Sequence, residues 1–290
     1  MRAKTANVKM MNVTVSNINL EDLKQKIASD GKDKFHVVAD FDGTLTKTYV
    51  NGKEIPSIIS ILRDGNYLTP DYSQKAHELY RKYHAIEIDQ KISDEEKQRK
   101  MLEWWTLHFE LLIKSGLNKK DLERVVESGG IQLRRGVLEF IDFLNQKNIP
   151  LIILSSSGLG TDTINLYLQN QGRLYPNVQV ISNAFNWDKK GFATGVKKPI
   201  IHSFNKDETA IRNNPVFQNV RERKNVLLLG NSPGDTKMIS GLDYETLIKI
   251  GFLNEKVTEN LEEFKRRFHV VITEDGNFDY VNNLVNLLFR

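Results

Sequence analysis

The sequence predicts an α/β protein with a doubly wound parallel sheet and a helical insert after the first strand. Three observations predict this fold class. Short apolar runs rich in β-branched residues recur along the chain, and helical patterns alternate with most of them. Between about residues 49 and 130, by contrast, the pattern is helical, with no convincing buried strand. A helical insert therefore interrupts the alternating part of the chain.

Six apolar runs are predicted strands and four amphipathic segments are predicted helices of the alternating part. The helices carry apolar residues at spacings of three and four, whereas the strands are short apolar runs typical of a buried parallel sheet. The predicted strands are Phe35–Ala39, Pro150–Leu154, Val178–Ser182, Asn225–Leu229, Thr246–Ile250 and His269–Thr273. The predicted helices are Val137–Gln146, Asp162–Gln171, Glu255–Phe268 and Tyr280–Phe289.

The insert is predicted to contain three helices of its own, at Asp71–His84, Ser93–Ser115 and Lys119–Ser128. Ser93 with Glu96 three residues later is typical of a capping box at a helix start. We therefore expect two domains, a core of residues 1–52 and 131–290 and a helical cap domain of residues 53–130.

Composition excludes several classes of protein. The absence of Cys excludes disulfide scaffolds, thiolate metal sites and a Cys nucleophile. The apolar runs are far shorter than the roughly 20 residues that a membrane span needs, and Met1–Asn12 lacks the apolar run of a signal peptide. We expect a cytoplasmic protein that does not bind membranes.

The net charge of +4 mildly favours anionic partners. Basic residues are scattered among acidic ones and form no stripe, so nucleic-acid binding is not expected. A small anionic substrate suits this charge distribution better, because a local cleft can be positive without a basic exterior. We expect a monomer that acts on a small molecule.

Asp40 and Asp42 follow the first predicted strand directly and carry the strongest functional signal. Sites in open α/β sheets form at the carboxyl ends of the strands, where these two carboxylates can share one cation. A simple Asp-Gly turn is the alternative, but it leaves the second carboxylate unexplained. The calcium-loop pattern fails because Leu45 stands where that loop needs Gly.

Three later segments offer complementary groups. Small residues from Ser155 to Gly160 precede a predicted helix, whose first N–H groups can bind an anion. Lys197 and Lys198 lie in a loop-like stretch and offer a cation. The loop from Gly230 to Asp235, which follows another predicted strand, presents Asn231 and Asp235 at the same sheet edge.

The same loop also matches Gly-x-Ser-x-Gly, the nucleophile elbow of α/β-hydrolases, with Ser232 as nucleophile. That mechanism needs a downstream His, and only His269 follows, at the start of a predicted strand. The elbow also leaves Asp40 and Asp42 unused. The other histidines, except His108, show no metal-ligand spacing and are interpreted as structural or surface groups: His36, His77, His84 and His202.

Asp40-Phe41-Asp42-Gly43-Thr44 resembles the first motif, Asp-x-Asp-x-Thr, of the haloacid dehalogenase-like phosphohydrolases. The resemblance implies that Asp40 attacks phosphorus to form an aspartyl-phosphate and that Asp42 protonates the leaving oxygen. It also implies that Mg²⁺ screens the negative charges, and that Thr44 and Asp235 support the site.

Further segments narrow the resemblance to the cytosolic 5′-nucleotidase III family, the pyrimidine and 7-methylguanosine monophosphate nucleotidases, over about residues 8 to 290. They are Lys82-Tyr83-x-Ala85-Ile86-Glu87-Ile88-Asp89, Glu103-Trp104-Trp105-Thr106, Ser156-x-Gly158-x-Gly160, Pro176-Asn177-Val178, Val180-x-Ser182-Asn183, Ile201-His202-x-Phe204-Asn205-Lys206 and Leu229-Gly230-x-Ser232-x-Gly234-Asp235.

This resemblance implies a set of core ligands. Ser156 and Ser157 would hold the phosphate, and Lys197 would neutralise it, preferred over Lys198 because it stands five residues before His202. Asp40, Asp42 and Asn231 would hold Mg²⁺, although the family pattern places Asp at position 231.

The insert resembles the family's cap, which implies three substrate contacts. Glu87 would face the base and Trp105 would stack on it, with Trp104 packing inside the cap. His108 occupies a position that carries a small polar residue near the substrate in relatives.

We therefore expect a Mg²⁺-dependent phosphohydrolase of nucleoside 5′-monophosphates with pyrimidine or 7-methylguanine bases, giving nucleoside and phosphate. The resemblance also allows phosphoryl transfer to another nucleoside. Two alternatives stay open: a nucleotide-binding protein whose turnover is impaired by Asn231, and the Ser232 esterase.

Overall fold

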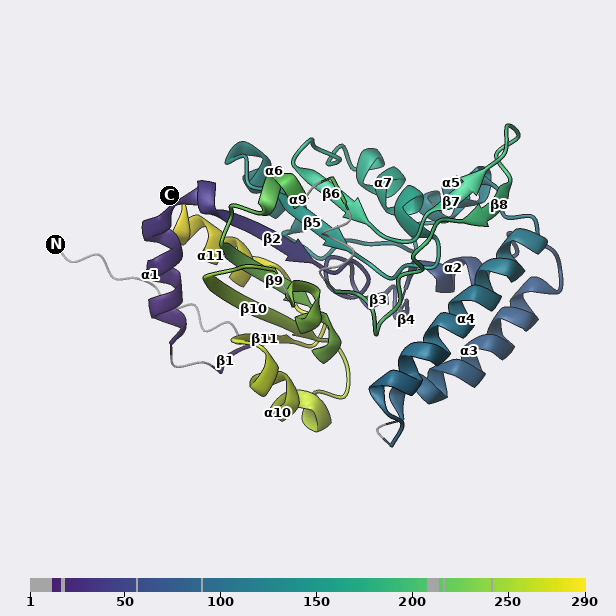
Figure 1. The fold of residues 1–290 in the computed structure, drawn as a ribbon, viewed down its shortest axis with the longest axis horizontal. Coiled ribbons are helices and arrows are strands. Elements are labelled where there is room, and N and C mark those ends of the chain that lie inside the picture. Colours follow the sequence, from purple (N-terminus) through teal and green to yellow (C-terminus); the bar gives the residue numbers. More distant parts are fainter. Residues whose placement is uncertain are drawn as a thin grey trace.

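A central seven-stranded sheet with helices on both faces forms the body of the protein (Figure 1). The structure is a computed structural model, and it describes residues 12–290 except 17, 18, 56, 90, 208–213, 216 and 241. Most of the segment Met1–Asn12, where we found no signal-peptide pattern, therefore lies outside the described residues. None of the described helices has the length and apolar character that a membrane span requires.

The sheet has the strand order β1-β11-β10-β9-β2-β5-β6, and its neighbours are parallel except for the antiparallel edge strand β1. The strands are β1 (Val13–Val15), β2 (Phe35–Ala39), β5 (Leu151–Leu154), β6 (Val178–Ile181), β9 (Asn225–Gly230), β10 (Thr246–Leu253) and β11 (Val270–Thr273). Because β2, β5 and β9 are parallel neighbours, the loops that follow them meet at one edge of the sheet.

Successive side chains of the central strands pack into different apolar clusters on the two faces, which explains why these strands are apolar throughout. Val37, for example, belongs to the larger cluster and Val38 to a smaller one. Helices of the insert contribute to the larger cluster, together with α1 (Leu20–Asp30), α6 (Val137–Gln146), α7 (Gly160–Asn170) and α11 (Asp279–Leu288). The smaller clusters include residues of α9 (Phe217–Val220), the 3-10 helix η2 (Pro233–Ile239) and α10 (Val257–Arg267).

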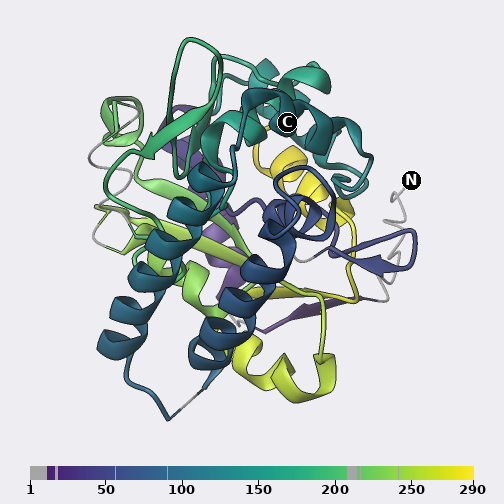
Figure 2. The ribbon, with the colours of Figure 1, turned by 90° about the vertical axis from the view of Figure 1, so that its right-hand side faces the viewer.

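The helical insert follows β2 and places two long antiparallel helices beside the sheet (Figures 1 and 2). Its helices are α2 (Ile58–Asp64), α3 (Tyr72–Ile88), α4 (Asp94–Lys114) and α5 (Lys119–Glu127). Short elements complete the fold: the 3-10 helix η1 (Lys32–Lys34) and two hairpins, β3 (Tyr49–Val50) with β4 (Lys53–Glu54) and β7 (Phe185–Trp187) with β8 (Ala193–Val196). The exact domain boundaries that we predicted remain a prediction.

The fold class predicted from the sequence is confirmed, and all six predicted strands and all seven predicted helices are present with small shifts at their ends. Ser93 accepts a hydrogen bond from the Glu96 backbone N–H at 3.2 Å, which is one half of the predicted capping box; the reciprocal bond from the Ser93 backbone N–H to the Glu96 side chain is not present among the described residues. The sequence patterns missed β1, α1, α2 and the two hairpins. These elements are short, or, in the case of α1, bury only Leu20 and Ile27 and so lack a clear apolar face.

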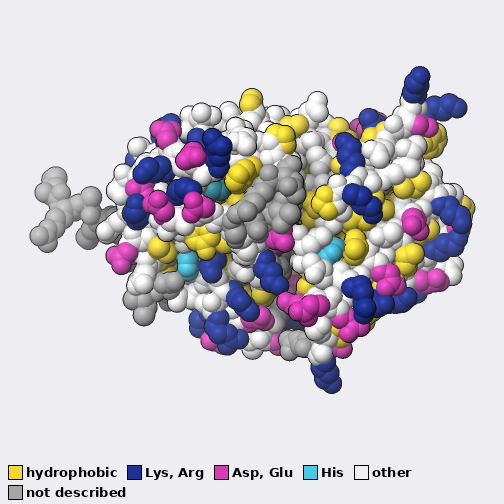
Figure 3. Space-filling view, in the orientation of Figure 1, with side chains coloured by type: hydrophobic (Ala, Val, Ile, Leu, Met, Phe, Trp, Pro, Cys, Tyr) yellow, Lys and Arg dark blue, Asp and Glu magenta, His cyan; other side chains and the backbone are white. Residues whose placement is uncertain are grey.

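On the face shown in Figure 3, Lys and Arg side chains lie among Asp and Glu side chains. This view agrees with the scattered charge pattern of the sequence.

The loop that carries Asp40 and Asp42 is held in place by one buried guanidinium. Arg134 donates to the carbonyl oxygens of Gly43 at 2.6 Å, Thr44 at 2.8 Å and Gly276 at 2.7 Å, and pairs with Asp275 at 2.9 Å. Only 1% of its side chain is exposed. Arg134 therefore ties the loop after β2 to the segment after β11.

We predict that Arg134→Met lowers the free energy of unfolding by about 3 kcal/mol or more, because it leaves several carbonyl oxygens without their donor and removes the cation paired with the partly buried Asp275. Its neighbour Arg135 supplies the control, since Arg135 pairs with Asp279 on the surface with 71% of its side chain exposed. Arg135→Met should leave stability nearly unchanged. Urea unfolding of the three proteins checks this; equal stability for both variants would contradict the role of Arg134.

Candidate active site

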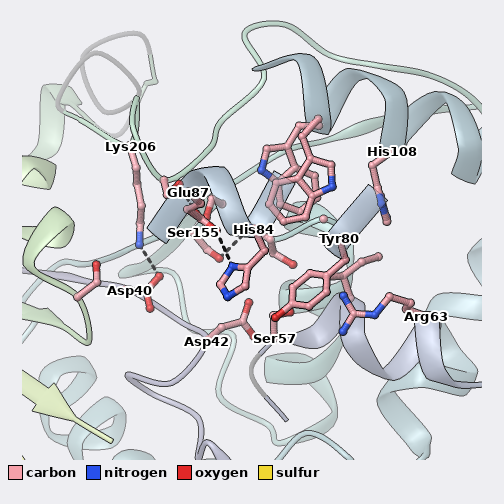
Figure 4. Close-up of a pocket in the computed structure, with 18 of the residues that line it drawn as sticks. Asp40, Asp42, Ser57, Arg63, Tyr80, His84, Glu87, His108, Ser155 and Lys206 are labelled. Carbon is pink, nitrogen blue, oxygen red and sulfur yellow. Dashed lines mark hydrogen bonds and ion pairs between the residues drawn. The ribbon is translucent and has the colours of Figure 1, made fainter. Parts of the chain in front are cut away.

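A cavity of about 380 Å³ lies between the carboxyl ends of the strands and the helical insert (Figure 4). The core loops supply one part of its lining: Asp40, Asp42, Ser155, Ser156, Ser157, Gly158, Ser203, Lys206, Asn231, Ser232 and Asp235. The segment containing α2, α3 and α4 supplies the rest: Ser57, Ile59, Arg63, Ala76, Tyr80, His84, Glu87, Trp104, Trp105 and His108. Ten of the eleven site residues proposed from the sequence are therefore in or beside this cavity, since Thr44 contacts Asp40.

Asp40 and Asp42 follow β2 and differ in their partners. The Asp40 carboxylate is buried and accepts a hydrogen bond from the Thr44 hydroxyl at 3.0 Å. The Asp42 carboxylate accepts the backbone N–H of Ile58 at 3.0 Å, at the start of α2. Gly43, the next residue of this loop, has a φ of +70°, and a Cβ there would lie 2.5 Å from the side chain of Asn231, which follows β9. Only Gly fits this turn.

The cation of the site is Lys206, not the predicted Lys197. The Lys206 ammonium donates to the Asp40 carboxylate and, at 2.9 Å, to the Asp235 carboxylate, and the side chain is only 6% exposed. Lys197 and Lys198 are exposed, just beyond the β7–β8 hairpin, and do not line the cavity. A solvated lysine there has no buried carboxylate to hold it at the site, which is why the prediction fails.

A compact turn presents Lys206 to the cavity. The Asn205 side chain accepts the backbone N–H of His202 at 2.7 Å and donates to the carbonyl of Ile200 at 2.8 Å. The sequence could have indicated Lys206, since Phe204-Asn205-Lys206 is part of a segment that resembles the nucleotidase family.

Burial and neighbouring charges shift the pKa values of Asp40, Asp42 and Lys206. Burial raises the pKa of the Asp40 carboxyl to about 6, because the attraction of Lys206 only partly offsets the loss of solvent. Burial, together with repulsion from Asp40, raises the pKa of Asp42 to about 7. Burial alone would lower the pKa of Lys206, but Asp235 and Asp40 outweigh it and raise the value to about 12. At neutral pH Lys206 stays charged and Asp42 can both give and take a proton.

The serine loop between β5 and α7 has hydrogen-bonding capacity directed at the same end of the cavity. The Ser155 hydroxyl accepts the backbone N–H of Ser157 at 3.1 Å. The buried Ser157 hydroxyl has no hydrogen-bond partner among the described residues. Ser156 is half-buried and lines the cavity. A buried hydroxyl without a partner, close to the start of a helix, fits an anionic ligand.

Asp235 organises the loop after β9. One of its carboxylate oxygens accepts the backbone N–H groups of Asn231 at 3.0 Å and Ser232 at 2.9 Å, and the Ser232 hydroxyl at 3.0 Å. The other oxygen binds Lys206. Asp235 therefore caps η2 and holds Lys206, which is consistent with the supporting role expected for it.

The donor set at this end fits a hard divalent cation. The carboxylates of Asp40 and Asp42 and the amide of Asn231 line the same part of the cavity, and Mg²⁺ accepts carboxylate and amide oxygens. The described residues contain no cluster of three His, Cys, Asp or Glu side chains suited to a metal ion. The residues thus fit Mg²⁺ with one neutral ligand in place of an anionic one.

The α3 and α4 helices form the other part of the cavity. Trp104 is buried between Tyr83 and Trp105, with ring centroids 5.9 and 5.6 Å apart. Trp105 approaches Gly158 so closely that a Cβ there would lie 2.6 Å from its ring. Both tryptophans line the cavity, so the expected division, with Trp104 packed inside the cap and Trp105 on the base, stays a prediction. Burial, and secondarily Arg63, lowers the pKa of His108 to about 3, so its ring is neutral.

Glu87 connects the insert to the core. Its carboxylate accepts the Ser203 hydroxyl at 2.6 Å and contacts His84 Nδ1 at 3.2 Å. His84, which we interpreted as structural or surface, lines the cavity, as do Tyr80 and Arg63. Ala76, Tyr80 and His84 are spaced four residues apart on α3, so a helical projection of the sequence would have placed them on one face.

The geometry does not support a Ser232 nucleophile. Ser232 has an ordinary extended backbone with φ of −135°, unlike the strained turn of a nucleophile elbow. Its hydroxyl donates to Asp235, and His269 accepts the backbone N–H of Lys249 at 3.2 Å.

Comparison with known proteins assigns the chain to a family. Residues 43–289 match the family described as pyrimidine 5′-nucleotidase (UMPH-1). The chain is 34% identical over 270 residues to 7-methylguanosine phosphate-specific 5′-nucleotidase A of Xenopus laevis, covering 93% of this chain and 92% of that protein. It is 33% identical over 267 residues to the human 7-methylguanosine phosphate-specific 5′-nucleotidase, covering 92% and 88%.

Solved structures agree with this assignment. A crystal structure of cytosolic 5′-nucleotidase IIIB bound to cytidine superposes with a TM-score of 0.87 at 27% identity, covering 97% of this chain and 94% of that one. A haloacid dehalogenase family hydrolase from Salmonella enterica, with a TM-score of 0.55 and 15% identity over 87% of this chain and 71% of that one, shares the fold. The chain belongs to the pyrimidine 5′-nucleotidase family and is a 5′-nucleotidase with a haloacid dehalogenase-like core.

Proposed function

We propose that this enzyme hydrolyses pyrimidine or 7-methylguanosine 5′-monophosphates through an aspartyl-phosphate on Asp40, with Mg²⁺ as cofactor. The observation that carries the proposal is the buried contact of Asp40 with Lys206 at one end of a cavity whose other walls are aromatic. A phosphate fits the charged end, and a base fits between aromatic side chains. The names of the relatives indicate the two base classes.

In the first half-reaction an Asp40 carboxylate oxygen attacks phosphorus, and the bond from phosphorus to the ribose 5′-oxygen breaks. Asp42 gives its proton to that oxygen, so the nucleoside leaves as a neutral alcohol. A pKa raised to about 7 suits Asp42 for this transfer, because a fraction is protonated at neutral pH.

In the second half-reaction Asp42, now ionised, takes a proton from water. The water oxygen attacks phosphorus, the bond from phosphorus to Asp40 breaks, and phosphate leaves. Lys206 and the hydroxyls of Ser156 and Ser157 would hold the phosphoryl oxygens in both steps. Asp40, Asp42 and Asn231 would hold Mg²⁺, which supplies positive charge against the repulsion between carboxylate and phosphate.

The helical insert would act as the cap that closes over the base, with Trp105, His108 and Glu87 near it. Contacts between the insert and the core support this role, since Glu87 binds Ser203 beside the cavity and Asp94 of α4 pairs with Lys237 of η2 on the surface at 3.0 Å. Exclusion of water at the reacting phosphate strengthens the electrostatic contacts there.

We predict that Asp40→Asn lowers kcat by at least about a thousandfold, because it removes the nucleophile while keeping the side-chain volume. Nucleotide binding, followed by calorimetry, should be retained. Comparison of the wild-type and mutant rates also separates an enzyme from a binding protein with little turnover, for which both rates would be equal and trace. More than trace hydrolysis by the pure mutant would contradict the covalent mechanism.

Matched variants of Lys206 and Lys197 test which lysine binds the phosphate. Lys206→Met should lower kcat/KM for UMP by about a hundredfold or more, since it removes a buried donor to the phosphoryl group. Lys197→Met should leave kcat/KM unchanged because Lys197 is exposed outside the cavity. Steady-state rates with released phosphate as the readout check both, with circular dichroism to confirm folding. The opposite pattern would restore Lys197 as the phosphate ligand.

The Asn231 position tests the metal site. Asn231→Asp adds an anionic oxygen ligand, so the Mg²⁺ concentration for half-maximal rate should fall by about tenfold or more. Calorimetric titration of the free enzyme with Mg²⁺ should show the same tightening without any turnover. If both titrations are unchanged in the mutant, position 231 is not a metal ligand.

A further inference from the structure

Arg63 lies at the end of the cavity that is remote from Asp40. In Figure 4 Asp40 and Lys206 lie at one side, Arg63 and His108 at the other, and Tyr80 and His84 between them. Arg63 comes from α2 and is only 8% exposed. A buried arginine in a substrate cavity has no part in the phosphate chemistry described above and needs another role.

No hydrogen bond from the Arg63 guanidinium to another described residue is present. Its carbon lies 4.4 Å from the Tyr80 ring centroid, and its Nε has no hydrogen-bond partner among the described residues. Its ion pair, from Nε to Asp64 at 3.5 Å, is long, and Asp64 also pairs with His77 at 3.2 Å. Buried polar groups of native proteins are normally hydrogen-bonded, so this guanidinium has capacity for a ligand atom.

The Tyr80 ring covers one side of the Arg63 guanidinium. An aromatic ring attracts the cation but accepts no ordinary hydrogen bond in the plane of the guanidinium, so the N–H groups stay available to a ligand. The cavity surface nearby is aromatic, apolar or neutral, because burial lowers the pKa of His108 to about 3. Glu87, the acidic residue of the insert in the cavity, lies toward the core and is engaged by Ser203 and His84.

We propose that Arg63 is a specificity-determining residue that donates a hydrogen bond to a carbonyl oxygen on the base edge remote from the ribose, so that uracil nucleotides are preferred over cytosine nucleotides. The inference rests on the proposed function, because phosphate at the Asp40 end directs the base toward Arg63. Uracil presents a carbonyl oxygen at C4, where cytosine presents an amino group. Two donors facing each other would leave both unpaired.

The ratio of kcat/KM for UMP to that for CMP measures this contact, because the two substrates have nearly the same size and the same phosphate. Wild-type enzyme should prefer UMP by about tenfold or more, as expected for a hydrogen bond to a charged group. Arg63→Met should bring the ratio close to one, mainly by loss of activity on UMP. The control Arg81→Met removes an exposed arginine of α3 that does not line the cavity, and should keep the wild-type ratio.

Arg63→Gln serves as a second variant if Arg63→Met does not fold, since its amide offers both a donor and an acceptor and should also bring the ratio toward one. A wild-type ratio near one, or a wild-type ratio retained in the folded Arg63 variant, overturns the inference. If the Arg63 variant loses activity equally on UMP and CMP, the ratio is unchanged, and this result indicates a structural role for Arg63. Failure of the wild-type enzyme to release phosphate from any nucleotide overturns the proposed function instead.

Discussion

Lys206 holds one ammonium group between two buried carboxylates, those of Asp40 and Asp235. These three groups come from three loops, after β2, after the β7–β8 hairpin and after β9, so their charges hold the loops together at the sheet edge. Removing the ammonium would leave two buried carboxylates without a counter-charge, which is unfavourable in a site with little solvent. The arrangement also keeps the Asp40 carboxylate next to the cation that a phosphate needs. Attack by an anion on an anion depends on this local excess of positive charge.

The helical insert separates the choice of substrate from the chemistry. Core loops supply the carboxylates, hydroxyls and ammonium, whereas α2, α3 and α4 supply Arg63, Tyr80, Trp105 and His108 to the remote end. The two parts share one apolar cluster, to which the insert contributes residues such as Phe109, and they also meet at Glu87 with Ser203 and at Trp105 against Gly158. Under the proposed function, substitutions in the insert would change the accepted base while the phosphoryl-transfer groups of the core stay in place.

The sequence predicted the part of the site that follows regular strands. Asp40, Ser156 and Asn231 come directly after apolar runs, and parallel strands bring their carboxyl ends to one edge. Lys206 lies in an irregular turn with no periodicity, so only the resemblance to relatives could have selected it over Lys197. Arg63 was missed because α2 is short and mostly apolar, with no pattern to show which way a residue faces. Tyr80 and His84 are four residues apart in a predicted helix, so the sequence could have placed them on one helix face.

The stereochemical course at phosphorus tests the central claim most directly. A chiral, isotope-labelled phosphorothioate analogue of UMP can be hydrolysed and the configuration of the product determined. Attack by Asp40 and then by water makes two in-line displacements, so the account predicts net retention. Net inversion would mean that water attacks the nucleotide in one step, and would contradict the role assigned to Asp40.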